Sequence, residues 1–255
     1  ICAALALTGT LSSHGDRTVE AWLATSFTCH LLVLSLSPLA PTLVGFYEVC
    51  GPLVWVISAV VLGSGEVRAA LGLAIGRVDG WPMVWAVLCA VISTCALIGW
   101  SLWWVRGSHG KIQETLAPGL SAWTLVPFAV INALREEGEF RMWLLGGMLA
   151  GHIGPERKLW VLLAIAVHAA WFAVFHVLEG FPSGLSGGAL VFIWAVFLGL
   201  LRWWANGMAL VLLLHILADV VIFVLVLIEK AARSRITMVS DDFEHDTPER
   251  EAEKK

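Results

Sequence analysis

Residues 208–228 read MALVLLLHILADVVIFVLVLI, an apolar run interrupted only by His215 and Asp219. The hydrocarbon core of a bilayer is about 30 Å thick, so a helix needs about 20 mostly apolar residues to cross it. Ionisable side chains cost free energy inside a bilayer, which makes an intramembrane His or Asp a functional candidate by default. This stretch therefore predicts a membrane-spanning helix with a polar site near its middle.

The composition of the whole chain also indicates a membrane protein. Of its 255 residues 58% are hydrophobic, and 36 are charged (16 basic plus 20 acidic). The segment 229–255 holds 8 of the acidic and 6 of the basic residues, which leaves 22 charges for the first 228 residues. That is too few for a water-soluble globule. A net charge of −4 without a Lys/Arg-rich run argues against binding of nucleic acid.

Further apolar runs, bounded by charged residues, Gly or Pro, predict further helices. The expected spans are 21–37, 42–63, 82–105, 120–134, 139–151, 159–178, 188–204 and 208–228. The fold class is accordingly all-α, a polytopic transmembrane helical bundle of about eight helices. The runs 120–134 and 139–151 are each short, so either one long tilted helix passes through residues 135–139 or two helices meet there.

The same patterns divide the chain into three parts. Residues 1–119 hold N-terminal helices without a readable motif, and residues 120–228 hold a helical core with the polar motifs. Residues 229–255 form an acidic tail that we expect to be disordered. The five cysteines form no CxxC pair and are typical of small buried apolar residues.

The first polar motif is Glu136-Glu137-Gly138-Glu139-Phe140-Arg141. On a helix Glu137 and Arg141 are i,i+4 neighbours, so the arginine can neutralise that carboxylate. Glu136 points about 100° away and would be free for acid/base chemistry. The alternative is a polar loop between helices whose charges are solvated.

The second motif is Phe172-x-x-x-His176, in which the aromatic ring can shield the imidazole and hold its rotamer. His168 on the same run is a competitor that spacing does not exclude. The third motif is His215-x-x-x-Asp219, in which the carboxylate can accept a hydrogen bond from one imidazole nitrogen. His176 could instead be a hydrogen-bonded packing residue, and His215 and Asp219 could instead be an intrahelical pair that only satisfies itself.

The order EExxxR, FxxxH, HxxxN/D on successive apolar helices resembles the CPBP family of CAAX proteases and bacteriocin-processing proteins, also called the Abi family. Its type II CAAX prenyl endopeptidases are the best-understood members. The resemblance covers roughly residues 120–228. It implies an intramembrane glutamate-dependent endopeptidase, with about eight helices around an internal polar cavity.

Carried over to this sequence, the resemblance implies that Glu136 and His176 activate the water that attacks the scissile carbonyl. His215 and Asp219 would lie across the cavity, where the oxyanion develops. The supporting residues would be the orienting pair of Glu137 and Arg141, with Phe172 as packing support.

One position departs from many family members, which carry Asn where this chain has Asp219. An ionised Asp cannot donate a hydrogen bond to an oxyanion. Asp219 is therefore either protonated or acts on His215 and keeps it a donor, and we favour the second.

We expect no cofactor. Two histidines and two glutamates would suffice to bind zinc, but there is no HExxH helix, and a metal-free acid/base set explains the same residues. The expected partners are the lipid bilayer and a membrane-associated protein or lipidated peptide. The substrate could be a CAAX-type C-terminus, a leader peptide or a C-terminal sorting signal. We expect a multi-pass integral protein of a prokaryotic plasma membrane.

Two other functions stay open at the level of sequence. Gly184-Leu185-Ser186-Gly187 matches the GxSG of rhomboid serine proteases, with His215 as a candidate base, but this leaves Glu136, Arg141 and His176 unexplained. A non-catalytic membrane protein, such as a transporter or a bacteriocin-immunity or scaffold protein, could also keep intramembrane charges.

Overall fold

The computed structural model describes residues 68, 71–107, 121–149, 157–178, 182 and 184–245. Seven helical segments account for most of them, and no strand occurs among the described residues. They are α5 (Gly80–Gly107), α7 (Leu125–Glu136), η1 (Glu137–Leu145), α8 (Gly146–Leu149), α9 (Lys158–Leu178), α10 (Gly184–Ala205) and α11 (Ala209–His245). The described part is all-α, as the sequence predicts.

Four of these helices are long and apolar enough to cross a membrane. They comprise Gly80–Trp103, Lys158–Val177, Gly184–Ala205 and Ala209–Ile228. Large apolar side chains stand exposed on their outer faces, for example Val87 (56%), Val91 (58%) and Leu159 (82%). Such exposure is unfavourable in water but favourable against lipid. The expected spans 21–37 and 42–63 lie outside the described residues.

The polar stretch 135–139 does not break the chain into two helices. The segments α7, η1 and α8 follow one another without interruption, and the residues at both junctions keep right-handed helical backbone angles. Within η1 the helix widens to i→i+5 hydrogen bonds, such as the one from the Gly146 N–H to the Arg141 carbonyl. Wide turns of this kind occur often at functional sites. Of the two alternatives for this region, the structure has the single helical rod.

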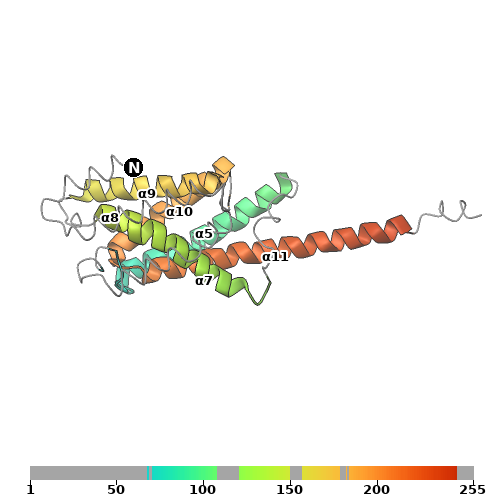
Figure 1. Cartoon of the computed structure of the whole chain (residues 1–255), viewed down its shortest axis with the longest axis horizontal. Helices are drawn as coiled ribbons and strands as arrows, with labels where there is room; N and C mark the ends of the chain where they lie inside the picture. Colours follow the sequence, from blue (N-terminus) through green and yellow to red (C-terminus); the bar gives the residue numbers. More distant parts are fainter. Residues whose placement is uncertain are drawn as a thin grey trace, which may run out of the picture.

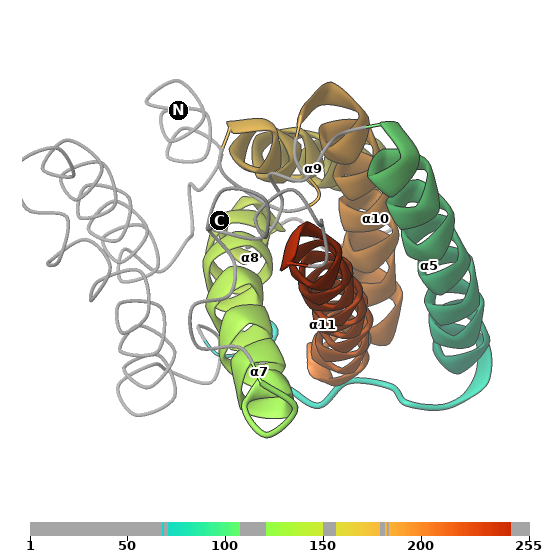
Figure 2. The ribbon, with the colours of Figure 1, turned by 90° about the vertical axis from the view of Figure 1, so that its right-hand side faces the viewer.

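The first half of α11 lies centrally, with α7 on one side and α10 and α5 on the other (Figures 1 and 2). The face of this helix that packs against its neighbours is buried through residues at helical spacing, among them Val211, Leu214, Ala218 and Ile222. α9 and α10 pack closely as neighbours: a Cβ added to Gly199 would lie 2.8 Å from Ile165 Cγ2. These contacts turn the motif-bearing faces of α7, α9 and α11 toward one another.

A loop preceding α5 fixes the position where α11 begins. Arg77 N–H donates to the Ala205 carbonyl at 2.7 Å, and Met208 N–H donates to the Ala74 carbonyl at 3.2 Å. A Cβ at Gly207 would lie 2.5 Å from the Cα of Gly76, so only glycine permits this approach. The turn between α10 and α11 is thereby held against the loop.

α11 extends well beyond the expected apolar span. It continues to His245 and so includes the first part of the segment for which we expected disorder. Residues 246–255 lie outside the described part of the chain.

Candidate active site

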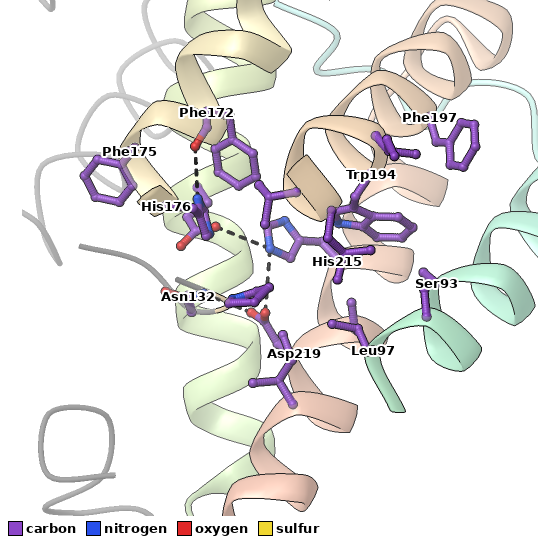
Figure 3. Close-up of a pocket in the computed structure, with 18 of the residues that line it drawn as sticks. Ser93, Leu97, Asn132, Phe172, Phe175, His176, Trp194, Phe197, His215 and Asp219 are labelled. Carbon is purple, nitrogen blue, oxygen red and sulfur yellow. Dashed lines mark hydrogen bonds and ion pairs between the residues drawn. The ribbon is translucent and has the colours of Figure 1, made fainter. Parts of the chain in front are cut away.

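A pocket of about 280 Å³ lies among α5, α7, α9, α10 and α11. One wall is polar, and the remaining walls are mostly apolar and aromatic. Trp194 and Phe197 belong to these apolar walls (Figure 3), as does Ile222. The polar wall consists of Asn132, Arg135, Glu136, His176, His215 and Asp219. An apolar pocket with a few converging polar groups is the usual form of a ligand site.

Two pairs of side chains link α7 to α11 along the polar wall. Oε2 of Glu136 lies 3.4 Å from Nε2 of His215. One turn away along both helices, the Asn132 side-chain amide donates to Oδ2 of Asp219 at 3.0 Å. The i,i+4 spacing within each helix makes this possible, because it places both members of a helix on one face. Each pair combines a carboxylate with a nitrogen donor.

Both ring nitrogens of His215 face carboxylates. Nδ1 lies 2.5 Å from Oε1 of Glu137, while Nε2 faces Glu136 and, at 3.7 Å, Oδ1 of Asp219. A carboxylate only accepts hydrogen bonds, so both sides are satisfied when both ring nitrogens carry hydrogen. His215 is then a double donor held in a fixed orientation.

The ion pair between Glu137 and Arg141 that the spacing predicts is present. Arg141 Nη1 lies 2.9 Å from Oε1 of Glu137, and both side chains are almost completely buried. The guanidinium also stacks 4.2 Å from the centre of the Phe172 ring. Buried charges are tolerated when they are paired in this way, so the pair supports the wall from behind.

Glu136 differs from its expected state. The spacing predicts an unpaired carboxylate, but Oε1 accepts from Arg135 Nη2 at 3.2 Å and Oε2 faces His215. The reason is tertiary: α11 brings His215 next to both glutamates, and the adjacent arginine folds back. Glu136 nevertheless lines the pocket, whereas Glu137 lies behind it.

His176 has one nitrogen fixed by the backbone. Its Nδ1 lies 3.0 Å from the Phe172 carbonyl oxygen, which can only accept, so Nδ1 carries the hydrogen. In the neutral ring Nε2 then has a lone pair for accepting a proton. The Phe172 ring packs edge-on at 4.4 Å between centroids, in line with the expected shielding.

The structure thus brings Glu136, His176, His215 and Asp219 to one pocket, with Glu137, Arg141 and Phe172 directly around them. His168, the competitor of His176, is fully buried elsewhere on α9 and does not line the pocket. Ser186 is exposed in the first turn of α10 and is likewise absent from its lining.

The sequence motifs do not single out two polar residues of the pocket, Asn132 and Arg135. Asn132 contacts Asp219, and its Oδ1 accepts from Arg135 Nη2 at 3.1 Å. The available signal was the spacing, since Asn132 precedes Glu136 by four residues and shares its helical face. Without the position of α11, nothing distinguished it from an ordinary polar residue.

The donor set gives little support for a metal. Among the described residues no three His, Cys, Asp or Glu side chains are arranged to hold a metal ion. A histidine ligand must offer a lone pair, whereas both nitrogens of His215 are directed at carboxylates.

The class of protein is defined by these features together: an all-α protein with membrane-spanning helices and a buried glutamate–histidine site. Residues 118–221 match the family model described as Type II CAAX prenyl endopeptidase Rce1-like. This match confirms the family resemblance over that segment, and the four apolar helices point to an integral membrane protein. Neither a curated protein nor a solved structure matches the chain.

Proposed function

We propose that this protein is an intramembrane endopeptidase that hydrolyses a peptide bond of a membrane-associated substrate with a Glu/His-activated water. The observation that carries the proposal is the convergence of Glu136, His176 and His215 in one mostly apolar pocket, within a segment that matches a peptidase family. Roles for individual residues follow from their contacts.

Glu136 and His176 activate the water. Glu136 is a carboxylate on the pocket wall, and the Nε2 lone pair of neutral His176 supplies a second acceptor. A positioned base contributes about 10²–10⁴-fold to such a reaction. The attacking water gives its proton to this pair, which later protonates the leaving amine.

His215 stabilises the negative charge that develops on the scissile carbonyl oxygen. Glu136 and Glu137 hold its ring from both sides as a donor. Donors fixed in advance in a water-poor pocket need no reorganisation as the charge develops. Asp219 acts on His215 through Oδ1 and helps to keep Nε2 protonated.

The apolar walls favour a substrate with apolar side chains or a lipid group next to the cleaved bond. A CAAX-type C-terminus, a leader peptide and a C-terminal sorting helix all fit this description. The substrates share a location at the membrane, in keeping with the four candidate spans.

The test uses the full-length protein purified in detergent and incubated with a panel of these three peptide types, with fragments identified by mass. Cleavage of at least one type is expected, and Glu136→Gln should lower kcat about 10³-fold. Glu139→Gln is the matched control, since Glu139 lies in the same helical rod but does not line the pocket. Cleavage by Glu136→Gln at the wild-type rate would contradict the mechanism, and flux of a solute without cleavage would favour a transporter.

A further inference from the structure

Asp219 leaves the polar wall with too few hydrogen-bond donors at the oxyanion position. As a carboxylate it only accepts, and its oxygens already face Asn132 and His215. A tetrahedral oxyanion is stabilised most when more than one donor points at it. Besides His215, the donors on this wall are Asn132 and Arg135, and the Arg135 guanidinium is directed at Asn132 Oδ1 and Glu136 Oε1.

Asn132 meets the chemical requirements for a second donor. Its amide orientation is unambiguous, because the nitrogen donates to Asp219 while Oδ1 accepts from Arg135. A primary amide nitrogen carries two hydrogens, and the bond to Asp219 uses one. Among the described residues no hydrogen-bond partner is found for the second N–H.

The placement of Asn132 is equally suitable. The side chain is half-buried and lines the pocket beside Asp219 (Figure 3). It lies one helical turn from Glu136 on α7. Its amide oxygen accepts from Arg135 on α7, and one amide hydrogen is donated to Asp219 on α11. The amide is therefore held in place before substrate binds. A donor fixed in this way loses little entropy on binding the oxyanion.

We propose that Asn132 is a catalytic residue that donates its second amide hydrogen to the oxyanion of the tetrahedral intermediate, together with His215. The inference rests on the proposed function and adds the donor that Asp219 cannot supply. The amide comes from α7, and Asp219 on α11 serves as its acceptor and holds it in place.

The test compares Asn132→Leu, which has a similar size but no donor, with the wild type on the cleaved peptide. Loss of one oxyanion donor lowers kcat about 10²-fold, and KM should change less than about threefold because ground-state binding is kept. Ile131→Val is the control on the same helix, since Ile131 is 42% exposed and faces away from the pocket lining. Its kcat should be that of the wild type.

A second substitution separates donation from mere bracing of Asp219. In Asn132→Leu/Asp219→Asn the amide at position 219 can supply the missing donor from a site 3.0 Å away. If a donor is required, this double variant should be at least about tenfold faster than Asn132→Leu. If Asn132 only holds the Asp219 carboxylate, replacing that carboxylate cannot restore the rate.

Each result decides a different statement. Unchanged kcat in Asn132→Leu overturns the role of Asn132 and leaves the protease proposal intact. The same holds for a double variant no faster than Asn132→Leu when Asp219→Asn alone keeps the wild-type kcat. A wild type that cleaves no peptide overturns the proposed function and this inference with it. Should Asn132→Leu melt far below the wild type, Asn132→Ser, which keeps a shorter donor, is measured against Asn132→Ala. Faster cleavage by the serine variant supports donation, and equal rates contradict it.

Discussion

Glu137 lies with its Oε1 2.5 Å from Nδ1 of His215, and the same oxygen lies 2.9 Å from Nη1 of Arg141. One carboxylate oxygen therefore connects the buried arginine of η1 to the central histidine of α11. This contact orients the imidazole so that its other nitrogen faces the pocket wall. The ion pair of Glu137 and Arg141, which the sequence predicts, therefore also positions His215, 78 residues further along the chain than Glu137.

Removal of Arg141 alone should destabilise the protein more than removal of Arg141 together with the charge of its partner Glu137. Arg141→Met leaves the buried Glu137 carboxylate without its arginine partner, at a cost of about 3–5 kcal/mol. Arg141→Met/Glu137→Gln removes both charges and should recover part of that loss. Thermal unfolding in detergent measures both variants, and equal melting temperatures would show that the pair is not coupled.

Phe172 should affect stability and catalysis together. Its ring contacts the Arg141 guanidinium on one side and the His176 ring on another. Phe172→Ala should lower stability by about 3–5 kcal/mol, as for other buried aromatic residues. Phe172→Leu keeps most of the volume, so it should unfold near the wild-type temperature yet have a lower kcat because His176 is no longer shielded. A Leu variant with full kcat would leave Phe172 as packing alone.

Gly207 should not tolerate even a methyl group. An added Cβ would lie 2.5 Å from Gly76 Cα and 2.6 Å from the Ala74 carbonyl oxygen, both backbone atoms that cannot move aside separately. Gly207→Ala is therefore expected to lower the melting temperature clearly. Gly99→Ala is the control, because a Cβ there meets nothing within 4 Å and alanine favours the helix. If both variants melt alike, the loop does not hold the start of α11.

Ser186 should be dispensable for cleavage. It is exposed at the first turn of α10 and does not line the pocket that holds His215. Ser186→Ala is expected to cleave peptide at the wild-type rate, and serine-directed inhibitors should leave the wild type active. Loss of activity in this variant, with unchanged melting temperature, would favour the rhomboid-like alternative.

The sequence predicts those helices whose positions follow from the length and hydropathy of a single apolar run. Apolar runs gave the positions of α5, α9, α10 and the first half of α11, because the bilayer imposes length and hydropathy on each span separately. The polar stretch 135–139 was ambiguous, since a wide helical turn with buried charges has no local signature distinct from a loop. Only packing against α9 and α11 decides it.

The sequence by itself determined which residues are candidates for the chemistry, because the i,i+4 spacings of Glu137 and Arg141, Phe172 and His176, and His215 and Asp219 place each pair on one helical face. The tertiary structure alone decided which faces meet. It placed both glutamates against His215, selected His176 over His168 as the pocket residue, and brought Asn132 to Asp219. The physical reason is that helix periodicity fixes directions within a helix, whereas the contacts between helices depend on the burial of the whole bundle.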